Sequence, residues 1–206
     1  MLLISTLIPL VKDKLGDICD SNNYRSIALS SLILKIFDWV IILLYGEKLD
    51  LDPLQFGYQS KVSTNMCTWA AVETIEYFTR NGSNVYVCAL DMSKAFDRVK
   101  HSTLFEKLLS KSLPDIFVIL LIYMYRNQCA KVRWDNNDSN NFSLTNGVKQ
   151  GAVLSAILYC IYVDDLYKHL RKENMAAGST ETFMEYLGIL TTYFSLPQLY
   201  LLLEKY

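Results

Sequence analysis

The stretch Val85-Tyr86-Val87-Cys88-Ala89-Leu90-Asp91-Met92-Ser93-Lys94-Ala95-Phe96-Asp97 carries the strongest structural signal in this chain. Its first six residues form an apolar run of the length of a buried β-strand, and the preceding Arg80-Asn81-Gly82-Ser83 is a strong turn signal. The run ends at Asp91, where a carboxylate is costly unless it is solvated, paired or bound to a cation. Taken alone, an aspartate that caps the turn into the next helix explains the pattern as well as a functional acid does.

Outward from this segment, hydrophobic periodicity and capping signals predict a mixture of helices and strands. The predicted elements are an opening strand within Met1–Val11, a helix over Ser26–Leu49, a helix capped by Ser63 or Thr64, a helix after Asp97 with Thr103 and Glu106 at capping-box spacing, a helix over Ile116–Tyr125, a hairpin around Asn136, and a helix over Val153–Leu170. No internal repeat or low-complexity linker interrupts them.

Composition excludes several classes of protein. Of 206 residues, 51% are hydrophobic, and only 8 Gly and 4 Pro accompany them, which excludes a disordered chain. A formal net charge of −1 argues against a uniformly basic nucleic-acid-coating protein, although residues 61–150 hold 11 basic and 8 acidic side chains. Five cysteines without a Cys-x-x-Cys pair, and only two histidines, indicate neither a zinc site nor a disulfide framework. Any chemistry therefore depends on carboxylates.

Several apolar runs raise the question of a membrane span. Leu29–Tyr45 contains Lys35 and Asp38, and Leu187–Leu203 is 17 uncharged residues long but is broken by Pro197. A helix needs about 20 apolar residues to cross the hydrocarbon core. Core helices are therefore the better interpretation of both runs.

Four blocks of residues, in this order, resemble one family. The first block is Leu7-Ile8-Pro9-Leu10 with Asn23-Tyr24-Arg25-Ser26-Ile27-Ala28-Leu29, and the second is Gln55-Phe56-Gly57-Tyr58 with Ser63-Thr64. The third is Leu90-Asp91-Met92-Ser93-Lys94-Ala95-Phe96-Asp97, and the fourth is Gly147-Val148-Lys149-Gln150-Gly151-Ala152-Val153-Leu154-Ser155. With them the chain resembles the reverse transcriptase domain of non-LTR (LINE-type) retrotransposons. The resemblance implies an α+β fold, a polymerase right-hand palm with partial fingers, in which the thumb and the second catalytic hairpin are absent. We expect residues 1–60 in the fingers, 61–175 in the palm, and 176–206 as a tail without family resemblance.

The resemblance also implies an RNA-directed DNA polymerase that uses Mg²⁺ or Mn²⁺, deoxynucleotides, a DNA primer and an RNA template. Asp91 corresponds to the first catalytic aspartate, a ligand of both metal ions, with help from the backbone carbonyl of Met92. In two-metal transfer one ion activates the attacking hydroxyl while the other stabilises the leaving oxygen. Phe96 corresponds to the residue under the incoming sugar that excludes a 2′-hydroxyl, although an apolar ring is also an ordinary core residue.

Other positions match residues that contact nucleotides or the template–primer. Arg25 corresponds to the arginine of the fingers that pairs with nucleotide phosphates, a role that suits a planar bidentate donor. Gln150 and Gly151 correspond to the element that packs on the nascent base pair, and Lys149 stands beside it where the family usually has Pro or Arg. Asp97 corresponds to a structural residue that caps the following turn.

The segment Tyr162-Val163-Asp164-Asp165 resembles the Tyr-x-Asp-Asp box that carries the remaining catalytic aspartates of the family. That box belongs on the tight turn of a β-hairpin, whereas this copy lies within the helix-period run Val153–Leu170. Asp164 and Lys168 also have the i,i+4 spacing of a helical ion pair. We therefore interpret Asp164 and Asp165 as a non-catalytic decoy.

If so, the second metal-binding box is missing, because residues 176–206 contain no Asp. One carboxylate does not hold two divalent ions against their mutual repulsion, so we predict that the chain as given, a truncated or frameshifted copy of an element, does not polymerise. The alternatives are a non-catalytic nucleic-acid-binding remnant and a small intracellular interaction protein. The resemblance implies an intracellular location, in cytoplasm and nucleus, without secretion or a membrane partner, and it leaves the oligomeric state open.

Overall fold

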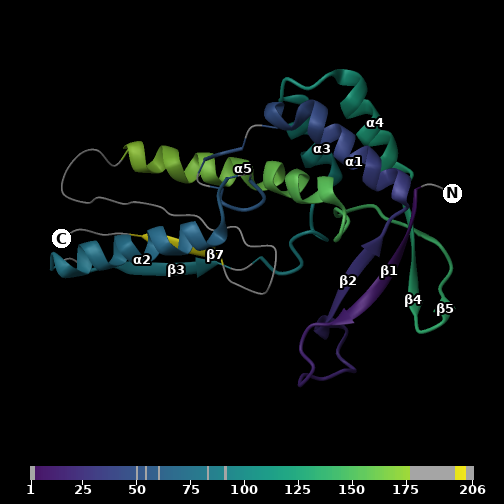
Figure 1. Cartoon of the computed structure of the whole chain (residues 1–206), viewed down its shortest axis with the longest axis horizontal. Coiled ribbons are helices and arrows are strands. Elements are labelled where there is room, and N and C mark those ends of the chain that lie inside the picture. The colour runs from purple at the N-terminus through teal and green to yellow at the C-terminus, as the bar shows by residue number, and fades with distance from the viewer. Residues whose placement is uncertain are drawn as a thin grey trace. The chain divides into compact units, whose positions relative to one another are not determined.

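The chain contains both helices and strands, as expected for an α+β fold (Figure 1). The computed structural model describes residues 3–49, 51–53, 55–59, 61–82, 84–90, 92–176 and 198–202. Contacts between residues divide it into two units, each made of two stretches of chain. The first unit comprises residues 1–50 and 95–159, and the second comprises residues 51–94 and 160–206.

The first unit is built on one five-stranded sheet. Its strands are β1 (Ile4–Val11), β2 (Tyr24–Leu29), β4 (Cys129–Trp134), β5 (Asn137–Asp138) and β6 (Phe142–Ser143). The order is β2-β1-β4-β5, with β6 also paired to β4; β1 and β2 are antiparallel, and β1 and β4 are parallel. The predicted opening strand and the predicted hairpin around Asn136 are both present in this sheet.

Helices of the first unit gather beside one end of the sheet (Figure 1). They are α1 (Leu32–Tyr45), which is followed by the 3₁₀ turn η2 (Gly46–Lys48), α3 (His101–Leu109), α4 (Asp115–Arg126) and the first turns of α5 (Val153–Ala176). A further 3₁₀ turn, η1 (Ser21–Asn23), lies in the connection between β1 and β2. Leu104, Leu108 and Leu121 are fully buried between them. Three rings, of His101, Phe105 and Tyr125, pack edge-on or tilted within about 6 Å of one another.

The second unit contains α2 (Thr64–Arg80), β3 (Tyr86–Leu90), β7 (Gln198–Leu202) and the remainder of α5. Ser63 caps α2 as predicted, because its hydroxyl accepts a hydrogen bond from the backbone N–H of Met66. Ala71 is buried on the inner face of α2, and Ile75, Phe78 and Val85 pack against it. Among the described residues, no helix is both long and apolar enough to cross a membrane.

Two predictions about the helices were wrong. Residues 26–29, predicted as the start of a helix, belong to strand β2 because they pair with β1, and α1 begins only after Ser31, its N-cap. Thr103 and Glu106 do not form a capping box, since the N-cap of α3 is Lys100 and no side chain bonds there.

From the sequence we also expected one sheet that combines the opening strand, Val85–Leu90 and the hairpin around Asn136, and this expectation was wrong. Strand β3 does not join the sheet of β1 but pairs with β7 in a separate antiparallel ladder, with Tyr86 opposite Leu202 and Leu90 opposite Gln198. Residues 198–202 of the apolar run Leu187–Leu203 are therefore a strand and not part of a core helix. The rest of that run lies outside the described residues.

Candidate functional site

A loop between β6 and α5, residues 147–152, connects segments that lie far apart in the sequence. At its start, the backbone N–H of Gly147 donates to the carbonyl of Val99 (2.8 Å), and the N–H of Val148 donates to the carbonyl of Phe96 (2.9 Å). These two bonds join the loop to the chain that follows the Asp91 block. The Gly-x-Lys-Gln-Gly block and the end of the Asp91 block are therefore neighbours in the first unit.

Glycine is required at position 147 for two reasons. The backbone has φ +86°, which L side chains rarely adopt, and a Cβ atom there would lie 3.1 Å from Cα of Asp97 and 3.2 Å from the carbonyl oxygen of Phe96. The carbonyl of Gly147 is also 2.8 Å from Nε2 of His101, at the start of α3. Backbone approaches backbone so closely here that any side chain would push the loop away.

The other end of the loop is joined to strand β2. The backbone N–H of Ala28 donates to the carbonyl of Gln150 (2.8 Å). Gly151 has φ +106°, and a Cβ on it would lie 3.3 Å from the carbonyl oxygen of Ala28. The block that contains Arg25 is thus bonded to the block that contains Gln150.

Residues from all three blocks surround one cavity of about 390 Å³ in the first unit. Across it, Nε2 of Gln150 donates to Oδ1 of Asp97 at 3.4 Å. The lining residues are Leu7, Ser26, Ala28, Asp97, Ser143, Leu144, Thr145, Asn146, Gly147, Val148, Lys149 and Gln150. Pockets for small ligands typically have volumes of about 300–1,000 Å³, so this cavity is large enough to hold a ligand of nucleotide size.

Not every residue singled out from the sequence lies in this cavity. Arg25 is half-buried in β2 next to Ser26, a residue that lines the cavity. Because neighbouring side chains of a strand lie on opposite faces of the sheet, the side chain of Arg25 leaves β2 on the face opposite to that of Ser26. The ring of Phe96 is half-buried and packs against Tyr159, with 5.1 Å between ring centroids. Their nucleotide-binding roles stay predictions.

The metal-binding prediction concerns Asp91, which lies outside the described residues. Its neighbour Met92 is 43% exposed and belongs to the second unit. Among the residues that the structure does describe, no group of three or more His, Cys, Asp or Glu side chains could hold a metal ion.

The Tyr-x-Asp-Asp segment lies within helix α5, as the hydrophobic periodicity predicts. The Asp164 side chain is 1% exposed, and its Oδ1 accepts hydrogen bonds from the backbone N–H of Asp52 (2.8 Å) and from Nε2 of Gln55 (2.9 Å). Its Oδ2 forms an ion pair with Lys168 at 2.6 Å, and this interaction raises the pKa of Lys168. Asp165, in contrast, is exposed. The carboxylate of Asp164 thus holds the loop that carries the Gln55-Phe56-Gly57-Tyr58 block.

One polar residue near the loop was not singled out from the sequence. Asp38 is only 8% exposed, in the apolar stripe of α1 between Leu34 and Ile41. Its carboxylate accepts hydrogen bonds from the backbone N–H groups of Leu154 and Val153, while burial raises its pKa. The sequence held one signal for it, an acidic residue at a core position of a predicted helix, where a charge without a partner is costly.

Comparison with known proteins identifies the class. The profile of the family "Reverse transcriptase (RNA-dependent DNA polymerase)" matches residues 12–187. The chain belongs to this family, and the resemblance found in the sequence is confirmed. The match continues past residue 175, where we expected the family resemblance to end.

Its relatives come from non-LTR retrotransposable elements. The chain is 26% identical over 154 residues to the Pol polyprotein of the type-2 element R2DM of Drosophila melanogaster, covering 73% of this chain and 14% of the relative. It is 33% identical over 150 residues to a probable RNA-directed DNA polymerase from the transposon X-element of the same fly (70% and 16%). It is 27% identical over 182 residues to the RNA-directed DNA polymerase of the mobile element jockey of Drosophila funebris (84% and 19%). The chain therefore spans less than a fifth of the length of each of these relatives.

Solved structures show the same fold. An apo telomerase of Candida tropicalis, truncated from its C-terminal domain, aligns with a TM-score of 0.59 and 13% identity over 98% of this chain and 44% of that one. A telomerase of the same organism in complex with a fragment of telomeric RNA aligns with a TM-score of 0.58 and 12% identity, over 98% and 36%.

Proposed function

We propose that this chain forms the partial fingers and part of the palm of an RNA-directed DNA polymerase, and that it holds a primed RNA template beside the loop 147–152. The observation that carries the proposal is the convergence of three motif blocks around one cavity: β2, the residues after Asp91, and the loop itself. Because hydrogen bonds join these blocks, which are distant in the sequence, we interpret them as parts of one binding site rather than as separate surface features.

The polar groups of the cavity suit this role. Gln150 offers an amide that both donates and accepts hydrogen bonds, next to the carboxylate of Asp97. Excess positive charge falls on residues 61–150, with 11 basic against 8 acidic side chains, and neutralisation of phosphates is the main source of affinity for nucleic acid. Two of the relatives are themselves named as RNA-directed DNA polymerases.

We infer further that two-metal nucleotidyl transfer in this family would use Asp91 and the carbonyl of Met92 here, and that these 206 residues alone do not extend a primer. Asp164, the first aspartate of the apparent Tyr-x-Asp-Asp box, already accepts hydrogen bonds from Asp52 and Gln55 within the protein. No aspartate follows Asp165 in the sequence. Binding of template and primer without extension is the function that these observations support best.

The test measures binding and extension on the same substrate. Fluorescence anisotropy of a labelled poly(rA)/oligo(dT) hybrid should report binding that weakens as salt rises. Gln150→Ala should weaken binding about fivefold, the value of one hydrogen bond of ~1 kcal/mol. Asn140→Ala, which removes an exposed amide from the β4–β6 region, is the matched control and should bind as the unaltered chain does.

Primer extension is then measured with labelled dTTP and Mg²⁺ or Mn²⁺. We expect no incorporation above background. Incorporation that Asp91→Ala abolishes would refute the inferred inactivity and leave the binding site intact. Absence of hybrid binding, or an equal effect of the Gln150 and Asn140 substitutions, would instead refute the assignment of the site.

A further inference from the structure

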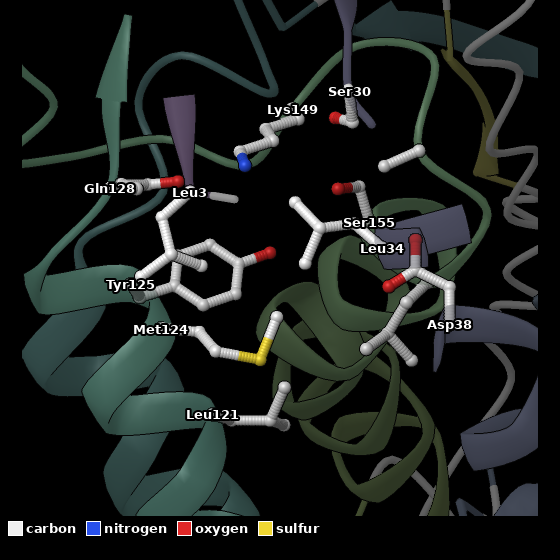
Figure 2. Close-up of a pocket in the computed structure, with 12 residues that line it drawn as sticks. Leu3, Ser30, Leu34, Asp38, Leu121, Met124, Tyr125, Gln128, Lys149 and Ser155 are labelled. Atoms are coloured by element: carbon white, nitrogen blue, oxygen red, sulfur yellow. The ribbon is translucent and has the colours of Figure 1, made fainter. Parts of the chain in front are cut away.

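A second, much smaller cavity also borders the loop 147–152 within the first unit, and Lys149 is a lining residue of both cavities (Figure 2). Its volume is about 30 Å³, room for one or two water molecules and far too little for a nucleotide. Its polar lining residues come from α1, α4, α5, the loop 147–152 and the connection between α4 and β4, namely Asp38, Tyr125, Ser155, Lys149 and Gln128. Within it Asp38 and Lys149 attract each other and Tyr125 is hydrogen-bonded to Ser155, so these four groups interact with one another rather than with a substrate.

Asp38 ties α1 to the beginning of α5. Its carboxylate accepts hydrogen bonds from the backbone N–H groups of Leu154 and Val153, the first residues of that helix. Such N–H groups have no partner within the helix, and the positive end of the helix dipole favours a carboxylate there. The end of the loop 147–152 is thereby fixed from inside the protein.

Lys149 enters the same cavity from the loop (Figure 2). It is half-buried, and its ammonium group and the carboxylate of Asp38 attract each other across the cavity. The next residue, Gln150, bonds in the other direction, to Ala28 and Asp97. The loop is held on both sides, and its one basic side chain is turned inward.

The arrangement does not contribute to stability in any simple way. Burial raises the pKa of Asp38 despite its two backbone hydrogen bonds, and burial lowers the pKa of Lys149 despite the nearby carboxylate. Both shifts mean that the folded chain disfavours the charged form of each group. Buried charge pairs often cost more in desolvation than they return in attraction, and a gain in conformational specificity is the best explanation where one is retained.

We propose that Asp38 is a positioning residue for the loop 147–152, and that Lys149 is its internal counter-charge and not a contact of template or primer phosphates. The pair fixes the loop so that Gln150 faces the larger cavity. This inference rests on the proposed function for the role of Gln150, but its first test needs no nucleic acid.

The first test follows cleavage by trypsin after Lys149, under native conditions and with mass spectrometry. Trypsin must bind the lysine side chain before it cleaves, so the inward position of Lys149 protects the Lys149–Gln150 peptide bond. Asp38→Asn, which keeps an oxygen for the helix N–H groups but loses the charge, should raise the rate of cleavage at this bond about tenfold, because cleavage follows the population of the open loop. Asp115→Asn, an exposed acid in the first turn of α4, is the matched control and should leave the rate unchanged.

The second test is the salt dependence of hybrid binding. A lysine that contacts phosphate contributes about 0.7–0.9 to the slope of log affinity against log salt concentration. We expect Lys149→Met to leave the slope unchanged. A slope reduced by that amount, or cleavage after Lys149 that is the same in the Asp38→Asn variant and the unaltered chain, would overturn the proposal. If the unaltered chain binds no hybrid, the proposed function fails, and the cleavage rates alone still decide the role of Asp38.

Discussion

Replacing Asp164 by alanine should strongly destabilise this protein. The substitution removes one acceptor that serves two donors, the backbone N–H of Asp52 at 2.8 Å and Nε2 of Gln55 at 2.9 Å. Asp52 is 4% exposed and Gln55 is fully buried, so water does not readily replace the lost carboxylate. A hydrogen bond to a charged group contributes about 1.5–3 kcal/mol.

The two bonds together give an expected loss of about 3–6 kcal/mol in the free energy of unfolding. The ion pair adds little, because the Lys168 side chain is 52% exposed and returns to water when its partner is lost. For a chain of this size a loss of that order lowers Tm by roughly 10 °C. Asp164→Asn retains an acceptor oxygen and should cost only about 1 kcal/mol.

Thermal and urea unfolding, followed by circular dichroism, measure these differences. Asp165→Ala is the control one residue away, on the exposed face of the same helix, and should change stability by less than about 0.5 kcal/mol. Equal stability of the Asp164→Ala and Asp165→Ala variants would refute the structural role of Asp164.

Two further predictions concern the loop and Asp38. Gly147→Ala should lower the free energy of unfolding in urea by about 2–3 kcal/mol, because the residue has φ +86° and its Cβ would lie 3.1 Å from Asp97. The control Gly82→Ala, with φ +78° and nothing within 4 Å of the added Cβ, should lower it by about 1 kcal/mol. An equal loss of stability in the two variants would contradict the close packing of the loop. The raised pKa of Asp38 favours the fold at low pH, and this contribution is lost as pH rises from its ordinary value of 3.8 through the folded-state value. Asp38→Asn should therefore gain in Tm relative to the unaltered chain as pH increases from about 4 to 7, whereas a constant difference in Tm over that range would show that the Asp38 carboxyl is not perturbed.

Local signals in the sequence predicted several elements correctly. The N-cap at Ser63 and the apolar periodicity of α5 are properties of short segments, so a helix at each place could be predicted without knowledge of the rest of the chain. Strand β2 was missed because its helix-like apolar spacing is overruled by pairing with β1. The partner of β3 could not be predicted either, because β7 lies more than a hundred positions away.

The residues of the candidate site also fall into those that sequence motifs could predict and those that they could not. Gln150, Gly151 and Asp97 stand in motifs of the family, and the structure brings them together. Asp38 stands in no motif quoted from the sequence, and its function depends on a helix that begins at Val153. Lys149 shows the limit of motif reasoning, since its position beside Gln150 is evident from the sequence but the direction of its side chain is not.

The bond between Ala28 and Gln150 has a consequence for how this protein folds. Strands β1 and β2 are close in sequence and can pair early, whereas this bond closes a loop that spans more than half of the chain, and contacts of such separation form slowly. During synthesis the cavity beside Gln150 cannot exist until the ribosome has released residues well beyond Gly151. We expect nascent chains that stop before Gly147 to contain the β1–β2 hairpin without any ability to retain nucleic acid at this site.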